Sequence, residues 1–227
     1  MKAHVPLSEF NSNKRPVNPL DTYETIITDL LQQQYAICDV FFSPAEALQL
    51  RQQMLEVYGE HDFHPAAIGN ARHELVVKSV RGDHIRWLDE QHHHATEALF
   101  FQKINHFVQY LNQTCYMGIE ESEFHYAVYP QGTFYQKHVD AFQNDDRRTL
   151  SLVLYLNDGH WQADFGGQLA LYLPTENGAE QVLEVLPVMG RLAIFDSKTI
   201  PHEVKTVHHT RYSITGWLKT RAVTSMV

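Results

Sequence analysis

Apolar residues recur at helical spacing in the first half of the chain, after segments that carry helix start signals. Asp21 is followed three residues later by Glu24, which is the spacing of a capping box, a pair of side chains that satisfies free amides at a helix start. The apolar positions that follow are Ile26, Ile27, Leu30 and Leu31. This pattern predicts a first helix over residues 22–33.

Two further helices are predicted before residue 115. Ser43, Pro44 and Glu46 give a second start signal, and Gly59 provides a stop. The apolar face between them consists of Leu48, Leu50, Met54, Leu55 and Tyr58. A third helix is expected over residues 96–113, and its predicted buried positions are Leu99, Ile104, Phe107, Val108 and Leu111.

The second half changes to short segments with strand character and frequent turns. Strands are predicted at 124–129, 134–140, 149–156, 168–173, 181–186, 191–196, 202–207 and 211–219. Such a pattern favours a sandwich or jelly roll, and helices confined to the first half would cover one of its faces. We therefore predict one α+β domain over residues 1–227, with helical support at about 20–115 and a strand-rich core at about 120–220.

Composition and charge narrow the function. The 227 residues carry a formal net charge of -9, which opposes nucleic-acid binding. No stretch approaches the roughly 20 apolar residues of a membrane helix, so we expect neither a membrane partner nor a nucleic-acid partner and assign the protein to the cytoplasm. The chain has 15 histidines, more than packing requires, which points to metal-ligand geometry.

The sharpest candidate is the triplet His138-Val139-Asp140. Residues two apart in a strand point to the same face, so this imidazole and this carboxylate can bind one ion together. One further histidine would complete a facial triad, which leaves adjacent positions open on Fe(II). A pair of polar residues on a surface strand is the alternative interpretation of the triplet alone.

Several ordered segments resemble the prolyl hydroxylase branch of the 2-oxoglutarate oxygenases, especially the oxygen-sensing type that modifies hypoxia-inducible transcription factor, and its bacterial relatives. The matching segments are Arg81 to Trp87, Tyr129-Pro130, Gly132 to Asp140, Tyr155-Leu156-Asn157, Gly166-Gly167 with Leu169, Pro201 to Val204 and Arg211 to Trp217. The resemblance implies a double-stranded β-helix, or jelly roll, with iron held by His138, Asp140 and His202. It also implies that Arg211 binds 2-oxoglutarate, with Tyr155 and Tyr129 beside it.

The residue pattern of the last strand agrees with that role. Arg211 and Trp217 lie on one strand face together with Ser213 and Thr215. An arginine that points into a β core is costly unless it is paired, and a carboxylate of 2-oxoglutarate would pair with it. Tyr155 ends an apolar run, so its hydroxyl also needs a partner. A structural Arg–Asp pair and an ordinary core tyrosine are the alternatives.

Substrate contacts are predicted from both aromatic and charged residues. Tyr135, Trp87 and Trp217, together with Tyr129, could form aromatic walls for a proline ring. By resemblance, Asp83 and Arg148 pair across the substrate groove. The polar segment 60–83 between glycines, in which 75–77 form a short strand, is expected to cover the substrate. His92 to His94 and His208-His209 are interpreted as solvated turns.

The resemblance implies hydroxylation of a peptidyl proline at C4, with release of succinate and CO2. Fe(II), 2-oxoglutarate and O2 are the expected cofactor and co-substrates, and ascorbate is a further expected ligand. The expected partner is a protein that presents a proline in a flexible segment. Hydroxylation of a small molecule such as a free amino acid, and a non-enzymatic jelly-roll binding module, are the alternatives.

Overall fold

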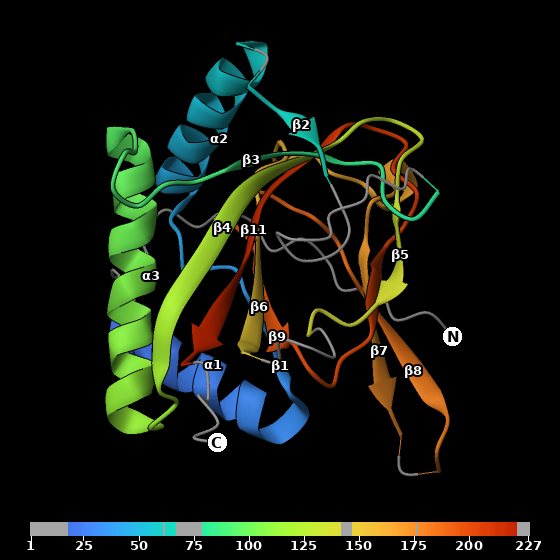
Figure 1. Cartoon of the computed structure of the whole chain (residues 1–227). Coiled ribbons are helices and arrows are strands. Elements are labelled where there is room, and N and C mark those ends of the chain that lie inside the picture. The colour runs from blue at the N-terminus through green and yellow to red at the C-terminus, as the bar shows by residue number, and fades with distance from the viewer. Residues whose placement is uncertain (1–17, 61, 67–78, 142–146, 176, 222–227) are drawn as a thin grey trace, which may run out of the picture.

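Two antiparallel sheets face each other in the computed structural model (Figure 1), which describes residues 18–60, 62–66, 79–141, 147–175 and 177–221. The larger sheet has the order β1 (Tyr35–Cys38), β9 (Leu192–Asp196), β6 (Arg148–Tyr155), β11 (Arg211–Thr220), β4 (Ile119–Tyr129), β3 (His84–Trp87) and β2 (His64–Pro65). The smaller sheet has the order β5 (Tyr135–His138), β10 (His202–Val204), β7 (Leu169–Pro174) and β8 (Glu180–Val185). The predicted α+β jelly roll is confirmed.

Three helices pack on the outer face of the larger sheet: α1 (Pro19–Gln33), α2 (Pro44–Gly59) and α3 (Ala95–Thr114). The start of α2 is the predicted capping box, because Glu46 N–H donates to Ser43 Oγ at 3.3 Å and Ser43 N–H donates to Glu46 Oε2 at 2.6 Å. The predicted apolar face of α2 is wrong at two positions. Leu48 and Leu55 are exposed, and the buried side chains are Ala47, Leu50, Met54 and Val57.

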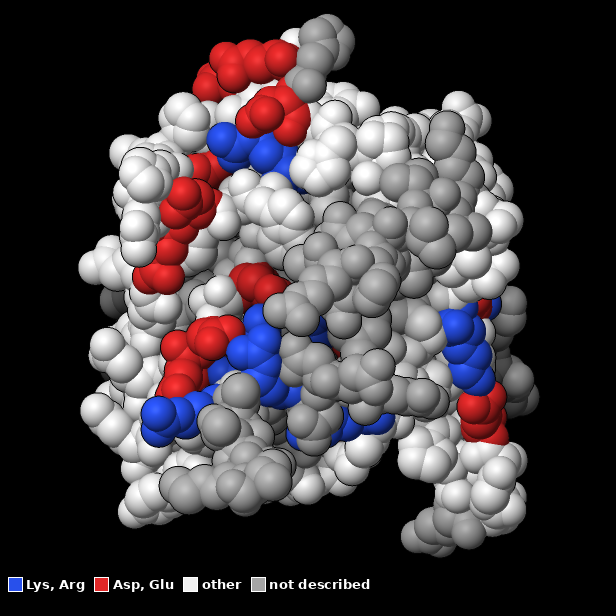
Figure 2. All heavy atoms as spheres, in the orientation of Figure 1, with Lys and Arg blue, Asp and Glu red and all other residues white. Residues whose placement is uncertain are grey.

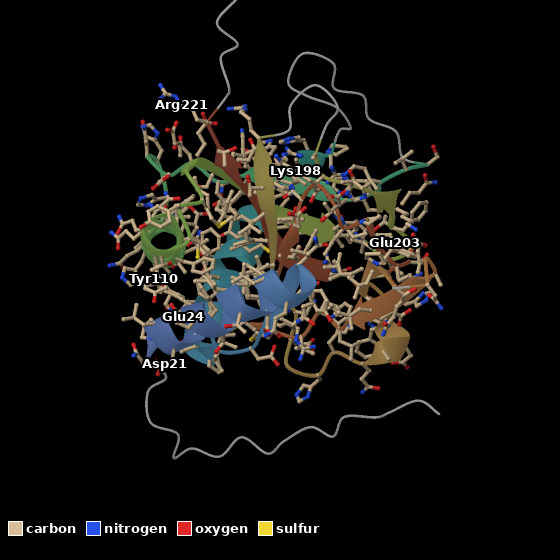
Figure 3. The ribbon with its side chains drawn as sticks, turned by 90° about the horizontal axis from the view of Figure 1, so that it is seen from below. Asp21, Glu24, Tyr110, Lys198, Glu203 and Arg221 are labelled. Carbon is tan, nitrogen blue, oxygen red and sulfur yellow. The ribbon has the colours of Figure 1, made fainter. Side chains whose placement is uncertain are left out.

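The other two helices form over the predicted segments, but their ends and buried positions differ in detail. Helix α1 begins three residues early because Asn18, not Asp21, caps it, with Leu20 N–H donating to the Asn18 side chain at 3.2 Å. Glu24 instead accepts a hydrogen bond from Tyr110 of α3, and this pair joins the two helices on the side shown in Figure 3. The side chains of α3 buried as predicted are Ile104, Phe107 and Leu111, while Leu99 and Val108 are half-buried.

Strict alternation along the central strands divides the interior into an outer and an inner layer. Leu150, Leu152 and Leu154 of β6 point to the helices and belong to the main core. Val153 and Tyr155 of the same strand point to the smaller sheet and pack in a second core with residues of β7. Because every residue of β6 from Leu150 onward is buried, both faces of this strand are covered.

Three strands of the larger sheet were not predicted, namely β1, β2 and β3. Each has at most four residues, so too few positions exist to show a period of two. The predicted strand at 75–77 and most of the predicted covering segment 60–83 lie outside the described residues. Within that segment, His64–Pro65 form β2 at the sheet edge and pair with β3.

The histidine-rich turns are exposed as predicted, at 92–94 and at 208–209. On the face drawn in Figure 2, described Lys and Arg side chains lie beside acidic ones. Among the described helices, none combines the length and the apolar character that crossing a membrane requires.

Gly216 tests how closely the central strands pack. A Cβ atom there would lie 2.2 Å from Glu123 O and 2.2 Å from the Phe124 ring, so Gly216→Ala overpacks β11 against β4. We expect a loss of about 1–3 kcal/mol in the free energy of unfolding, measured in urea. Gly59→Ala is the matched control, because nothing lies within 4 Å of its Cβ position, and it should not lose stability. Equal stability of Gly216→Ala and wild type would contradict the packing described.

Candidate active site

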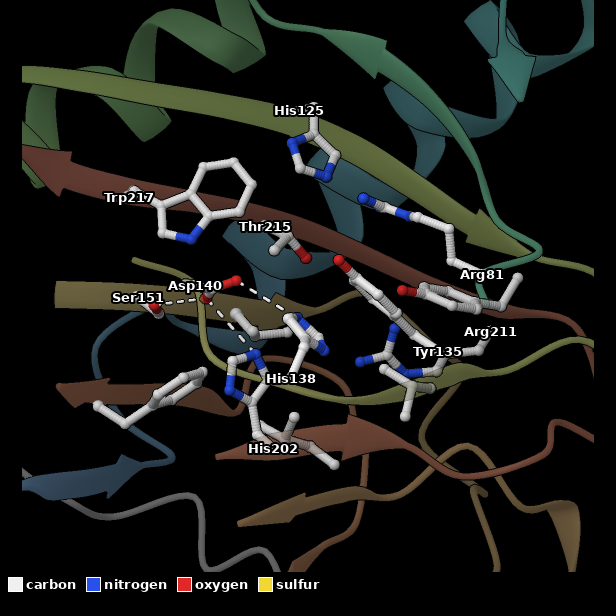
Figure 4. Close-up of a pocket in the computed structure, with 15 residues that line it drawn as sticks. Arg81, His125, Tyr135, His138, Asp140, Ser151, His202, Arg211, Thr215 and Trp217 are labelled. Carbon is white, nitrogen blue, oxygen red and sulfur yellow. Dashed lines mark hydrogen bonds and ion pairs between the residues drawn. The ribbon is translucent and has the colours of Figure 1, made fainter. Parts of the chain in front are cut away.

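The inner faces of three neighbouring strands meet along β11. Its register places Arg211 opposite Tyr129 of β4, Ser213 opposite Tyr155 of β6, and Trp217 opposite Ser151 of β6. These positions therefore form one wall between the sheets, and the smaller sheet supplies the other wall. The cavity between the two walls is lined by Arg81, His125, Tyr129, Tyr135, His138, Asp140, Ser151, Val153, Leu169, Phe195, His202, Val204, Arg211, Thr215 and Trp217 (Figure 4).

Three potential metal ligands meet in this cavity. The Nε2 atoms of His138 and His202 each lie 3.4 Å from a carboxylate oxygen of Asp140, the first from Oδ1 and the second from Oδ2. Strands β5 and β10 pair His138 directly with His202, which accounts for the meeting of residues 64 positions apart in sequence. Among the described residues, this is the one group of three His, Cys, Asp or Glu side chains that could hold a metal ion.

Backbone carbonyls orient both imidazoles for metal binding. The Nδ1 atom of His138 lies 2.7 Å from Gln136 O, and that of His202 lies 3.1 Å from Ile200 O. A carbonyl can only accept, so each Nδ1 carries the proton and each Nε2 presents its lone pair to the centre of the group. Two imidazole nitrogens and one carboxylate are the donor set of a facial triad, so these residues fit Fe(II).

Burial and charge set the protonation states of the group. Burial lowers the pKa of His202 to about 4, so its ring is neutral near pH 7. Burial alone would raise the pKa of Asp140, but the two histidines and the Ser151 hydroxyl hold it well below its usual range. A neutral imidazole and an ionised carboxylate are the states that bind metal.

An aromatic ring and a guanidinium restrain the imidazole of His138. The Tyr135 ring stacks on His138 at 3.7 Å between centroids, with an interplanar angle of 19°. The Arg81 guanidinium lies over the Tyr135 ring, 4.4 Å from its centroid, and pairs with Asp83 at 2.6 Å. The His138 imidazole therefore has little freedom to turn away from the centre.

Arg211 lies at one end of the cavity as a buried cation. Its side chain is 1% exposed, and no carboxylate of a described residue lies within 4.0 Å of it. One guanidinium nitrogen donates to Ser213 Oγ at 3.2 Å, whereas Nε has no hydrogen-bond partner among the described residues. The structure therefore excludes, for the described residues, the alternative of a structural Arg–Asp pair.

Two tyrosines and a glycine complete this end. The Arg211 guanidinium lies 5.0 Å from the ring centroids of both Tyr129 and Tyr155, and no described residue forms a hydrogen bond with the buried Tyr155 hydroxyl. Gly167 adopts φ +69°, and a Cβ there would lie 3.0 Å from Arg211 Cδ, so glycine leaves the room that the arginine side chain takes. Unpartnered donors around a buried positive charge form a site for an anion.

The opposite end of the cavity holds uncharged polar atoms. Trp217 Nε1 and His125 Nδ1 are buried and have no hydrogen-bond partner in the described part of the chain, and their rings lie 5.6 Å apart. Trp87 packs on the outer side of His125 at 4.9 Å and is 44% exposed, so it does not line the cavity. Figure 4 shows the metal-ligand group between this end and Arg211.

The predicted charged pair across the groove is not formed. Asp83 is buried and pairs with Arg81, while Arg148 pairs with Glu123 at 2.9 Å and lies over the Trp217 ring at 3.5 Å. Neither Asp83 nor Arg148 lines the cavity. The reason is proximity, because each charge has a nearer opposite charge: Arg81 lies two residues before Asp83 in the chain, and Glu123 of β4 reaches Arg148 of β6 across β11.

Among the polar and charged residues that line the cavity, Arg81, His125 and Ser151 were not predicted from the sequence to face it. A period of two would have found two of them, since His125 shares a face of its strand with Tyr129, and Ser151 shares a face with Tyr155. Arg81 lies outside the named strands, in an isolated bridge to Tyr135. No periodic signal marks such a residue.

The sequence is similar to those of known proteins. The model of the 2OG-Fe(II) oxygenase superfamily matches residues 124–219. The hypoxia-inducible factor prolyl hydroxylase of Caenorhabditis elegans is 30% identical over 203 residues, which are 86% of this chain and 28% of that protein.

Two solved structures are similar over most of the chain. A Pseudomonas putida prolyl-4-hydroxylase is 32% identical with a TM-score of 0.77, covering 88% of this chain and 100% of that one. A prolyl hydroxylase from Trichoplax adhaerens, solved with a hypoxia inducible factor oxygen degradation domain peptide fragment, is 28% identical with a TM-score of 0.77, covering 88% and 90%.

The buried His125 predicts a pH dependence of stability. Burial, with the charge of Arg81 acting in the same direction, lowers the pKa of His125 to about 3, whereas the unfolded chain titrates at about 6.5. Between these values the unfolded state binds more protons, so stability falls as the pH decreases. We expect this histidine to contribute up to about 1.4 kcal/mol per pH unit between about pH 6.5 and pH 4 in metal-free protein.

Urea unfolding at about pH 7, 6 and 5 measures this slope. His125→Leu should reduce it, while His93→Gln, at an exposed position, should leave it unchanged. Equal slopes in wild type and His125→Leu would contradict the neutral, buried state of the imidazole.

Proposed function

This chain belongs to the 2OG-Fe(II) oxygenase superfamily, and from that premise we propose that it hydroxylates a proline residue, at C4, within a flexible segment of another protein. The observation that carries the proposal is the cavity with two unlike ends on either side of His138, Asp140 and His202. One end offers an unpaired guanidinium, and the other offers aromatic rings and uncharged donors. The two ends suit an anionic co-substrate and an uncharged substrate respectively.

The proposed roles at the first end follow from charge. Arg211 would bind the distal carboxylate of 2-oxoglutarate with its fork of donors, and the Tyr155 hydroxyl would donate to the same carboxylate. Tyr129 would close the site from the side, since its ring lies against the guanidinium. Bound Fe(II) with 2-oxoglutarate and O2 supplies the oxidation of a C–H bond to an alcohol, with release of succinate and CO2.

The proposed substrate end is aromatic. Trp217 lines the cavity at this end and Tyr135 stacks on the ligand His138, and flat rings are suitable surfaces for the ring of proline. The Arg148 guanidinium packs over the Trp217 indole, 3.5 Å from the ring centroid. The similarity to the Caenorhabditis elegans protein and to the two solved structures supports proline over other substrates, because all three are prolyl hydroxylases.

Four narrower predictions from the sequence remain part of this proposal. Ascorbate would act as a further ligand, and the enzyme would work in the cytoplasm beside its protein substrate. Trp87 would contact the substrate from the exposed rim, where it packs on His125. Asp83, which does not line the cavity itself, would act on the substrate through Arg81, which it fixes over Tyr135.

A test for the substrate class is mass spectrometry of cell proteins incubated with the enzyme, Fe(II), 2-oxoglutarate and O2. We expect hydroxyproline in one or a few protein segments, in proportion to the succinate formed. His202→Ala is the control without a complete metal site and should give neither product. If succinate formation increases with an added free amino acid while every protein stays unmodified, the small-molecule alternative is favoured. If no succinate forms, the non-enzymatic binding module is favoured.

The guanidinium at the first end generates a graded prediction for 2-oxoglutarate affinity. Removing one partner of a buried charge pair costs about 2–5 kcal/mol, so Arg211→Ala should weaken binding about 30-fold to several-thousand-fold. Tyr155→Phe removes one donor to a charged acceptor and should cost about 1.5–3 kcal/mol. Arg211→Lys should recover only part of the affinity, because an ammonium cannot form two parallel bonds.

Titration of 2-oxoglutarate into the anaerobic Fe(II) protein, followed by its metal-to-ligand charge-transfer band, measures these affinities. Arg221→Ala is a matched control, since that arginine side chain is 82% exposed and far from the cavity lining. Fe(II) binding should change little in all of these variants. Wild-type 2-oxoglutarate affinity in Arg211→Ala would remove the main physical reason for the assignment.

A further inference from the structure

The metal-binding carboxylate is not held by a strand. Strand β5 ends at His138, so Asp140 lies two residues beyond its last hydrogen-bonded position, and residues 142–146 lie outside the described part of the chain. The strand pleat therefore cannot fix the direction of this side chain. Contacts from other elements must do so.

We propose that Ser197 and Ser151 are positioning residues for Asp140. The Ser151 Oγ atom lies 2.6 Å from Asp140 Oδ2, and it lies 2.8 Å from Ser197 Oγ. The exposed fractions of Ser151 and Ser197 are 1% and 0%, so water does not compete for these hydroxyls. This inference rests on the proposed role of Asp140 as an iron ligand and adds two residues to that site.

The chemistry of the three groups fixes the direction of the hydrogen bonds. An ionised carboxylate can only accept, so the single Ser151 proton is donated to Asp140. The Ser151 oxygen then has only lone pairs to offer, so Ser197 must donate its proton to Ser151. The chain runs from Ser197 through Ser151 to Asp140, and aligned hydrogen bonds of this kind strengthen one another.

Ser197 also holds the backbone beside Asp140. Its carbonyl accepts a hydrogen bond from Ala141 N–H at 3.0 Å, and its own N–H donates to Thr149 O at 3.1 Å. It therefore joins three segments: the end of β9, the start of β6 and the loop that carries Asp140. One residue thus restrains the carboxylate through its side chain and its main chain.

A functional consequence follows from the choice of oxygen. Ser151 donates to Oδ2, and among the described residues no hydroxyl donates to Oδ1, which lies beside the Nε2 atom of His138. A carboxylate held in this way offers one oxygen to an ion and takes one coordination position. A side chain free to turn could offer both oxygens and take a position that the two co-substrates need.

The test measures binding of Co(II) alone to metal-free protein by calorimetry. Partners of metal ligands typically contribute 10- to 100-fold to metal affinity, so Ser151→Ala should weaken Co(II) binding by about that factor. Ser197→Ala should weaken it less, because its backbone contacts remain. Ser151→Thr, which keeps the hydroxyl, should restore most of the affinity.

Two variants serve as controls. Ser213→Ala removes a hydroxyl that is equally buried on the adjacent strand and contacts Arg211, so it should leave the Co(II) affinity unchanged. Asp140→Ala should abolish Co(II) binding, and if it does not, the triad assignment fails rather than the role of the serines. Thermal unfolding of the metal-free variants establishes that each is folded.

The outcome separates positioning from packing. Weaker Co(II) binding in folded Ser151→Ala and Ser197→Ala, with recovery in Ser151→Thr, supports the proposal. Co(II) affinity within about twofold of wild type in both alanine variants, with lower thermal stability alone, would show that the hydroxyls serve only the core and would overturn it. Should Ser151→Ala not fold, Ser197→Ala decides by the same criterion.

Discussion

The pleat of β11 is the constraint on which the site depends. This strand lies between β4 and β6, so its outward residues Ile214 and Leu218 must be apolar to meet the helices. Its inward residues, Arg211 and Trp217 among them, are then presented in line along one wall of the cavity. A shift of register by one residue would bury the polar set against the helices, so packing of the outer core enforces the geometry of the inner site.

Buried polar atoms of the inner layer lower the stability of the fold, and the apolar outer layer offsets this loss. Arg211 Nε, Tyr155 OH, His125 Nδ1 and Trp217 Nε1 are all buried without a hydrogen-bond partner, and each such group is unfavourable by about 1–3 kcal/mol. The outer core is continuous, aromatic-rich and fully buried at positions such as Phe42, Phe100 and Phe107. Four of the six unsatisfied buried atoms of the described residues thus occur in the inner layer, where a bound molecule can supply the missing partners. The other two are the Tyr126 hydroxyl in the outer core and His84 Nδ1.

The sequence predicted those parts of the fold whose signals are repeated. The start of helix α2 was predicted correctly because Ser43 and Glu46 form a true capping box, whereas Asp21 failed as a cap because Asn18 precedes the helix and takes that role. The three short strands β1, β2 and β3 gave no period. In the site, the pattern His-x-Asp gave the right pair for an incomplete reason, since Asp140 lies beyond the strand. Arg81 and the two serines depend on contacts between distant elements, which no local pattern contains.

Charge distinguishes the two ends of the cavity. Arg81 and Arg148 lie near the substrate end, but each is paired with a carboxylate, Asp83 or Glu123, so neither presents an uncompensated charge. Arg211 has no such carboxylate among the described residues. An anion placed at the Trp217 end would therefore lose water without meeting a free cation, and an uncharged peptide placed beside Arg211 would leave that cation unpaired. These two penalties favour the arrangement in which the proposed co-substrate binds at Arg211 and the proposed prolyl segment binds at Trp217. The reverse arrangement is disfavoured. The cavity thus selects the orientation of both molecules by where it leaves a charge unpaired.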